Sequence, residues 1–313
     1  MRRNGFLLLI TTLFFSPVYA DNQPTIQHVI YITLDGVRFQ DMDKTQPYFS
    51  KLWEKYADKL TTYGLPTSQA PMEVASVPLG LPSYQGQMAG SIQPCRDNQC
   101  GYIQVKTLPE TLITQYHFAK KDVAIFSSWP EIHYVTETKP GTVYTNAGNT
   151  PVMDPITKQA DTVMATLNHE QDIHHPQYKL HRYDKYTFAQ ALHYMEKYQP
   201  RFLWIALVNA DDEAHAGNLN QYHQLLHYYD DALHGLFNTL QSMHMDKNTM
   251  VIVTTDHGRG NDENWTTHGA NYPESKQTWA FVMNGKLQPV SQDGEMGHYN
   301  TLSIRPTIEK ALI

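Results

Sequence analysis

Positive charge is scarce in this chain. Its 313 residues include 24 lysines and arginines against 31 aspartates and glutamates, a formal net charge of −7. Nucleic-acid-binding proteins normally carry a basic excess because they neutralise backbone phosphates, so the composition argues against a nucleic-acid partner. Hydrophobic residues make up 41% and charged residues 18% of the chain, which is typical of a folded globular protein.

Long hydrophobic runs are also missing. Residues 1–20 have a basic start, a short apolar core and small residues ending at Ala20, as a signal peptide does. The apolar core is shorter than the roughly 20 residues that span a bilayer. We therefore expect a cleaved signal peptide, a periplasmic or secreted mature chain without a stable membrane span, and one domain over residues 21–313. Nothing in the sequence sets the oligomeric state.

Only two cysteines are present, Cys95 and Cys100. In an exported protein, a close and even-numbered pair favours a disulfide that closes a small loop. A metal site is the alternative, but it would need further ligands, because no second cysteine pair exists.

Three short apolar runs are each followed closely by a carboxylate. Residues 28–34 precede Asp35, residues 202–208 precede Asp211, and residues 250–253 precede Asp256. Continuous apolar runs rich in β-branched residues are typical of strands buried on both faces of a parallel sheet. Because functional groups gather at the carboxyl ends of such strands, we expect the three acids to lie at one edge of the sheet.

Helical periodicity fills the intervals between these runs. Apolar residues recur at helical spacing over residues 183–198 and 219–243. The alternation predicts an α/β fold with a mostly parallel central sheet and helices on both faces. Residues 130–182 contain many turn formers, which predicts an irregular insertion that either covers the active face or lies on the surface without a role. We interpret its histidines, among them His181, as polar loop residues.

Carboxylates and imidazoles recur beside the strand ends at spacings that suit metal ligands. Asp211 and His215 are four residues apart, so a helix would place them on one face. Asp256 is followed directly by His257, and His268 comes soon after. With Asp35 these give six oxygen and nitrogen ligands, enough for two divalent ions. Such ligands favour zinc, and manganese is the alternative.

These motifs resemble those of a known family. Residues 32–36, 211–215, 255–260 and 268–269 are similar to the metal-binding motifs of the alkaline phosphatase superfamily. The nearest branches are the type I phosphodiesterases/nucleotide pyrophosphatases and related exported bacterial members. Residues 81–84, Gly90 and residues 305–307 extend the resemblance over nearly the whole mature chain.

The resemblance implies a division of ligands and a reaction. Asp211, His215 and His268 would hold one ion, and Asp35, Asp256 and His257 would hold the other. The ion pair would stabilise the attacking and leaving oxygens of a displacement at phosphorus. The implied activity is hydrolysis of a small-molecule phosphate ester, a phosphodiester before a monoester. Transfer of a phosphoalcohol group and cleavage of sulfate or phosphonate esters use the same machinery.

One position departs from the family pattern. Members carry a threonine, serine or modified cysteine nucleophile just before a short Leu-Pro or Phe-Pro element, and Gly80 stands at that position here. Ser76 or Ser83 could replace the nucleophile, with Thr67 and Ser68 as more distant candidates. Direct attack by zinc-bound hydroxide would avoid the covalent step, since zinc lowers the pKa of bound water to about 7.

The remaining alternative is a catalytically silent metal-containing binding protein. Among residues other than metal ligands, Ser76 is our candidate nucleophile, although serines serve commonly as caps and turns. Asn98 lies in the cysteine loop at a distance from Gly80 that resembles the phosphoryl-oxygen donor of the diesterase branch. A plain turn residue is the other interpretation of Asn98, and a disulfide across the loop would preorganise it as a donor.

Overall fold

The structure is a computed structural model that describes residues 25–68, 70–178, 180–292 and 295–313. The predicted signal peptide, residues 1–20, lies outside the described residues. Strand β1 (His28–Leu34) lies at the centre of a seven-stranded sheet, between β6 (Phe202–Leu207) and β7 (Thr249–Thr254), and is parallel to both. The three apolar runs thus form the three adjacent central strands.

The full sheet has the order β2-β8-β7-β1-β6-β4-β5. Its other strands are β2 (Leu60–Tyr63), β4 (Val123–Ser127), β5 (Tyr144–Ala147) and β8 (Ala280–Met283). Strand β8 pairs antiparallel with β7 and with β2, whereas the pairs from β7 through β5 are parallel. The prediction of a mostly parallel sheet is therefore confirmed. A smaller sheet contains β3 (Met72–Glu73), β9 (Val290–Gln292) and β10 (Glu295–Asn300).

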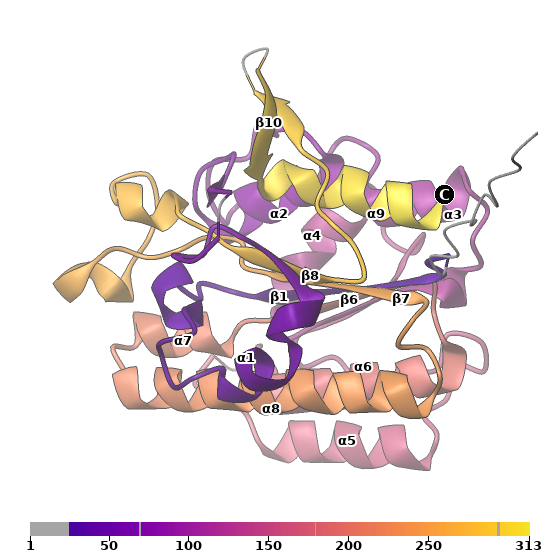
Figure 1. The fold of residues 1–313 in the computed structure, drawn as a ribbon. Coiled ribbons are helices and arrows are strands. Elements are labelled where there is room, and N and C mark those ends of the chain that lie inside the picture. Colours follow the sequence, from indigo (N-terminus) through magenta and orange to yellow (C-terminus); the bar gives the residue numbers. More distant parts are fainter. Residues whose placement is uncertain (1–24, 69, 179, 293–294) are drawn as a thin grey trace, which may run out of the picture.

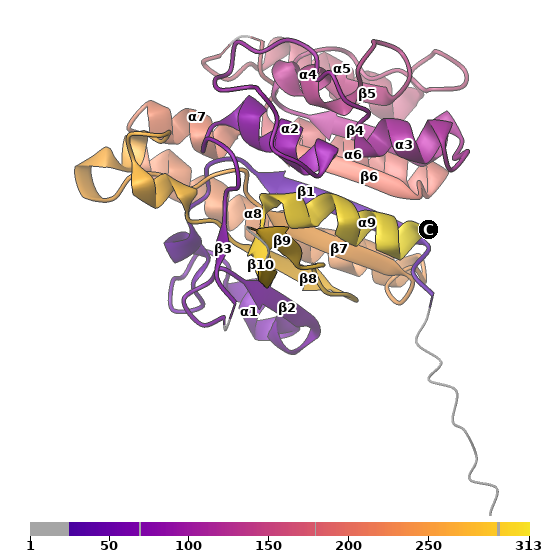
Figure 2. The same ribbon diagram turned by 90° about the horizontal axis from the view of Figure 1, so that it is seen from above.

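Helices cover both faces of the central sheet, as predicted (Figure 1). One face carries α1 (Ser50–Tyr56), α6 (Asp184–Tyr198) and α8 (Leu219–Ser242). The other carries α2 (Gly80–Ala89), α3 (Leu108–Thr114), α4 (His133–Thr136) and α9 (Ile304–Leu312). Seen from above, α2 and α9 lie over the middle of the sheet (Figure 2). Helices α6 and α8 match the two helical patterns of the sequence.

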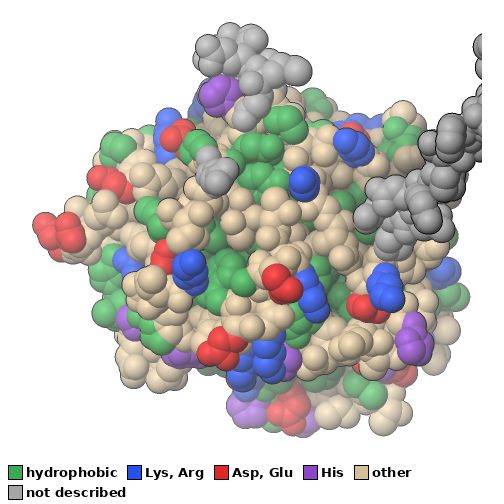
Figure 3. Space-filling view, viewed as in Figure 1, with side chains coloured by type: hydrophobic (Ala, Val, Ile, Leu, Met, Phe, Trp, Pro, Cys, Tyr) green, Lys and Arg blue, Asp and Glu red, His purple; other side chains and the backbone are tan. Residues whose placement is uncertain are grey.

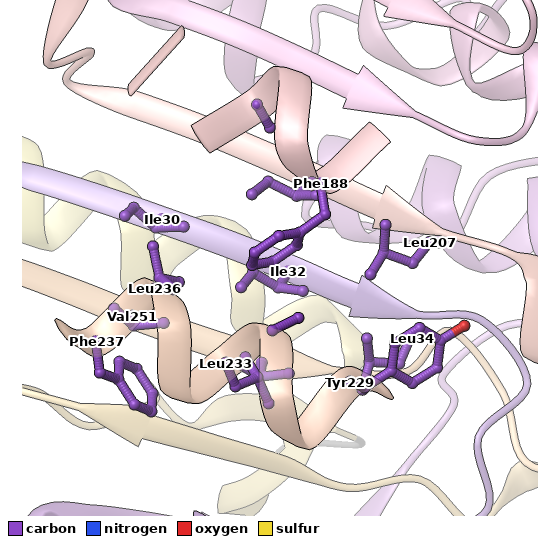
Figure 4. Packing of buried hydrophobic residues seen from close by; sticks show 14 of the residues in the cluster. Ile30, Ile32, Leu34, Phe188, Leu207, Tyr229, Leu233, Leu236, Phe237 and Val251 are labelled. Atoms are coloured by element: carbon purple, nitrogen blue, oxygen red, sulfur yellow. The ribbon is translucent and has the colours of Figure 1, made fainter. Parts of the chain in front are cut away.

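The alternation of side chains along β1 explains this layering. Ile30, Ile32 and Leu34 belong to the core between the sheet and helices α6 and α8, where Figure 4 shows Ile32 beside Phe188 and Leu34 beside Tyr229. Val29 and Tyr31, which alternate with them along β1, belong to the opposite core, under α2 and α9. Because both faces are buried, alternate positions of the strand are equally apolar, which gives the continuous hydrophobic run.

The segment 130–182 is only partly irregular. It contains α4, β5 at the edge of the sheet and α5 (Thr162–Ile173), which packs on α6. Only Met164 and Gln171 of α5 are buried, and Val163 and Ile173 are exposed. The helix therefore lacks the amphipathic pattern by which a sequence reveals a helix.

Charge is dispersed over the molecular surface seen in Figure 3, where acidic and basic side chains alternate without gathering by sign. Among the described residues, no helix is both long and apolar enough to cross a membrane.

Candidate metal centre and active site

The parallel register brings three acids to one edge of the sheet. Asp35 directly follows β1 and Asp256 follows β7. Asp211 lies in helix α7 (Asn209–His215), which begins just beyond β6. Since β1 pairs with β6 and β7 up to its carboxyl end, the three chain segments leave the sheet side by side. Helix α7 and the loop after β7 project from the same end of the molecule (Figures 1 and 2).

The first cluster contains Asp211, His215 and His268. The Nε2 atom of His215 lies 3.1 Å from Oδ2 of Asp211 and 3.0 Å from Nε2 of His268. One helical turn separates Asp211 from His215, so α7 presents both on one side, as the sequence predicted. The other ring nitrogen of His268, Nδ1, lies 2.9 Å from the carbonyl of Pro78. This contact orients the ring so that Nε2 faces the cluster.

The second cluster contains Asp35, Asp256 and His257. The Nε2 atom of His257 lies 3.6 Å from Oδ1 of Asp35 and 3.2 Å from Oδ2 of Asp256. The remaining oxygens are anchored, because Tyr84 donates to Oδ2 of Asp35 and the Gly36 amide donates to Oδ1 of Asp256. Oδ2 of Asp256 is buried and has no hydrogen-bond partner among the described residues. Such an oxygen is costly unless an ion satisfies it, so this cluster fits a metal cation.

Asp211 also lies close to the second cluster. Ligand atoms of Asp35, Asp211 and His257 all fall within 4.8 Å of one another. The guanidinium of Arg259 donates to Oδ1 of Asp211. Arg259 is buried, and its other nitrogens donate to two backbone carbonyls of residues 265–266. It therefore cannot turn away easily, and it leaves Oδ2 as the oxygen of Asp211 that faces His215.

Charge is concentrated in this buried site. Burial raises the pKa of Asp35 well above its ordinary value, and the charges of Asp256 and Asp211 raise it further. Burial, with the charge of Asp211, likewise raises the pKa of Asp256 to about 7. Burial also opposes ionisation of Asp211, but the Arg259 guanidinium, together with His215 and His268, outweighs it and holds the pKa well below the usual range. Burial lowers the pKa of His257 well below its ordinary value. Neutral imidazoles beside crowded carboxylates are the state that binds a divalent ion.

A cavity of about 230 Å³ lies over the two clusters. Its lining includes every proposed ligand except Asp256, together with residues from α2, the cysteine loop and the segment 130–182. The lining residues are Asp35, Gly80, Asn98, Trp129, Tyr178, His181, Val208, Asp211, Asp212, His215, His257 and His268. The segment 130–182 thus contributes to the active face.

Gly80 opens helix α2 and faces this cavity. A β-carbon at Gly80 would lie 2.9 Å from two ring atoms of Trp129 and 3.4 Å from Oδ1 of Asn98. Contacts below 3.0 Å require the neighbour to move. The indole of Trp129 therefore occupies the space into which a side chain at position 80 would project.

The cysteine loop supports the start of α2. Cys95 and Cys100 form the predicted disulfide, with Cα atoms 5.8 Å apart. Within this loop, Oδ1 of Asn98 accepts a hydrogen bond of 2.9 Å from the amide of Leu81. The oxygen of the carboxamide is thus engaged, and its nitrogen is the group left to donate to a ligand.

The candidate nucleophilic hydroxyls do not line the cavity. Ser76 donates to the next backbone carbonyl at 3.2 Å, and buried Ser83 donates to the carbonyl of Asp256 at 2.7 Å. Thr67 and Ser68 are also absent from the lining. Among the described residues, none of these four hydroxyls belongs to the cavity lining.

His181 and Asp212 were missed by sequence analysis. Nδ1 of His181 lies 3.0 Å from Oδ2 of Asp212, which also accepts from the amide nitrogen of Asn209 at 3.2 Å. Burial opposes protonation of His181, but the Asp212 carboxylate outweighs it and raises the pKa. The two residues are 31 positions apart, so no local spacing signals the pair. The only hint was a second carboxylate next to Asp211.

Comparison with known proteins gives a family match and many structural matches. The sulfatase family model matches residues 27–302. A 2-O GAG sulfatase superposes with a TM-score of 0.62 and 13% identity, over 92% of this chain and 70% of that one. The lipoteichoic acid synthase LtaP from Listeria monocytogenes superposes with a TM-score of 0.56 and 12% identity, over 91% of this chain and 72% of that one.

A magnesium-bound variant of TAB5 alkaline phosphatase gives a TM-score of 0.52 and 15% identity, over 92% of this chain and 98% of that one. Identities this low show a shared fold and nothing finer. No curated protein matches the sequence.

Proposed function

Since the chain belongs to the sulfatase family, within the alkaline phosphatase-like superfamily, we propose that it is a metal-dependent hydrolase of phosphate esters. Phosphodiesters are the preferred substrates and monoesters come second. The observation that carries the proposal is the convergence of two ligand clusters at Asp211, beneath a cavity that includes the first residue of α2. Such a site can neutralise and orient a phosphoryl group.

We expect two divalent ions, zinc or manganese. Asp211, His215 and His268 would hold one ion, and Asp35, Asp256 and His257 the other. Mixed carboxylate and imidazole ligands suit these metals. When bound, the ions would neutralise charge on the phosphoryl and leaving oxygens.

The side chains around the clusters would orient the ester. The N-terminal end of α2 favours a negatively charged group, and the carboxamide nitrogen of Asn98 can donate to a phosphoryl oxygen. Trp129 and Tyr178 both line the cavity. These aromatic side chains give the second substituent of a diester apolar surface to pack against, which supports the preference for diesters.

Turnover of three activated substrates tests this function. Chelated chain reloaded with zinc or manganese should hydrolyse bis(4-nitrophenyl) phosphate faster than 4-nitrophenyl phosphate, and both faster than 4-nitrophenyl sulfate. His268→Ala should abolish turnover, whereas His175→Ala, at an exposed histidine outside the cavity lining, should not. Faster cleavage of the sulfate would contradict the substrate assignment.

A silent binding protein is the second candidate. The observation that favours it is the cavity lining, which contains no serine, threonine or cysteine among the described residues. A metal-loaded chain that binds vanadate or inorganic phosphate tightly but turns over none of the three esters would establish this alternative.

We also propose that the chain works outside the cytoplasm after removal of residues 1–20. The disulfide between Cys95 and Cys100 supports this, because disulfides persist in oxidising compartments. Intact mass of the chain recovered from the periplasm or medium should place the mature N-terminus at Asp21. Recovery of the uncleaved chain would contradict export by this route.

A further inference from the structure

Gly80 is part of a packed contact and not merely a missing side chain. The indole of Trp129 would lie 2.9 Å from a β-carbon at this position. The backbone that carries this ring is held, because the amide of Trp129 donates to the hydroxyl of Ser127 at 3.0 Å and that hydroxyl donates to the carbonyl of Trp129 at 2.9 Å. The packing at position 80 therefore leaves no room for a nucleophilic side chain unless Trp129 moves.

Neighbouring hydroxyls do not compensate. Ser83, one turn into α2, is buried with its hydroxyl on the carbonyl of Asp256 and receives a bond from Gln87 at 3.2 Å. Ser76 is turned to a backbone carbonyl. Reaching the cavity would require either serine to break these bonds, and buried groups lose free energy when left unpaired.

His181 is the one imidazole of the described lining that belongs to neither metal cluster. Its Nδ1 is fixed on Asp212, which is buried and is held in turn by the carboxamide of Asn209. Its Nε2 has no hydrogen-bond partner among the described residues. A carboxylate on Nδ1 fixes the ring and stabilises the imidazolium, so that Nε2 can accept a proton.

We propose that the ester is cleaved in one displacement by water, with His181 as the base and Asp212 as its positioning residue. This inference rests on the proposed hydrolase function. The oxygen of a water molecule forms a bond to phosphorus while the bond to the leaving oxygen breaks. The proton of the water passes to Nε2 of His181 and then to solvent, and the leaving alkoxide takes a proton from solvent. No bond forms between the protein and phosphorus.

The stereochemical course tests the single displacement. One diastereomer of a 4-nitrophenyl phosphorothioate diester is hydrolysed in ¹⁸O-water by the metal-loaded chain. We expect inversion at phosphorus, and no phosphorylated protein by intact mass after acid quenching during turnover. Retention, or a phosphorylated peptide at any residue, would overturn the proposal. Failure of the wild type to turn over any ester would instead reject the proposed function itself.

Variants of His181 test the base. His181→Gln should lower kcat by about 10² to 10⁴-fold, the usual contribution of a general base, while metal content per chain stays at the wild-type value. Added imidazole should restore part of the activity of His181→Gly. The matched control is His175→Gln, at the exposed histidine six residues before His181. Loss of metal in His181→Gln, an unchanged kcat in His181→Gln, or no rescue of His181→Gly by imidazole would each overturn the role.

Discussion

The imidazole rings of His257 and His268 stack face to face, with centroids 3.7 Å apart and planes 15° from parallel. One ring belongs to each ligand cluster. Nδ1 of each lies 2.9 Å from a backbone carbonyl, of Gly258 and Pro78 respectively. Both Nε2 atoms are therefore directed at the clusters, and the stack fixes the distance between the two sites.

Substitutions in the two ligand clusters should remove different amounts of metal from the chain. Asp256→Asn should remove one equivalent of metal per chain, because it neutralises the unpartnered oxygen of the second cluster. Asp211→Asn should lower both occupancies, because Asp211 lies near both clusters. Elemental analysis after gentle purification measures the ratio, with exposed Asp58→Asn as control. An Asp256→Asn chain that keeps the full wild-type metal would contradict the assignment.

Tyr84 should tune the second metal from outside its ligand set. Its hydroxyl donates to Oδ2 of Asp35 at 3.0 Å, and loss of such a partner typically weakens metal affinity about 10 to 100-fold. Tyr84→Phe should show this loss in competition with a chromophoric chelator. The half-buried Tyr102→Phe, which is not in the cavity lining, should bind metal as the wild type does; equal affinity of all three chains counts against the second cluster.

A side chain at position 80 should conflict with Trp129. We expect Gly80→Ser alone to lower the free energy of unfolding by about 1–3 kcal/mol, the cost of overpacking. Trp129→Ala should relieve this, so that in a double-mutant cycle the Gly80→Ser change costs less in the Trp129→Ala background. Urea unfolding of the four chains in the cycle measures these free energies. Additive effects of the two substitutions would show that a side chain at position 80 does not clash with Trp129.

The disulfide should stabilise the loop that carries Asn98. Replacing both cysteines by serine should lower the free energy of unfolding by about 2 kcal/mol, as expected for a loop this short. The amide hydrogen of Leu81, which bonds to Asn98, should then exchange with solvent faster than in the wild type. Asn98→Ala with the disulfide intact separates the two effects; unchanged unfolding of the double serine variant would refute this expectation.

Asp154 should make stability depend on pH in the acid range. Burial opposes its ionisation, but hydrogen bonds from Lys197, at 2.7 Å, and Tyr198 outweigh it and hold its pKa well below the usual value. Below about pH 4, which is the ordinary pKa of an aspartate, the unfolded chain takes up a proton that the folded chain does not. The free energy of unfolding therefore decreases as the pH is lowered.

Asp154→Asn should remove this part of the acid dependence and lower stability at pH 7 by about 2 kcal/mol, a usual contribution of charged hydrogen bonds. Denaturant unfolding at pH 7 and pH 3 measures both. If the variant loses as much stability on acidification as the wild type, Asp154 is not the source.

The layered fold could be predicted because each central strand is buried on both faces. Residues 28–34, for example, are apolar at every position except Thr33 and the terminal His28. The helical spacing of apolar residues in α6 and α8 reveals two of the helices that cover one face. Helix α5 could not be found in this way, because only Met164 and Gln171 along it are buried. Because the helix buries so little apolar surface, its sequence shows no helical periodicity of apolar residues.

By itself the sequence predicted the central parallel strands and the three acids at their ends, because local patterning and strand direction settle both. It favoured the disulfide because it contains only two cysteines, close together. Tertiary structure alone decided that Trp129 stands over Gly80, that Arg259 takes one oxygen of Asp211, and that His181 meets Asp212. Those contacts join segments far apart in the chain. Their geometry depends on how loops pack over the sheet edge, and no short-range spacing encodes that packing.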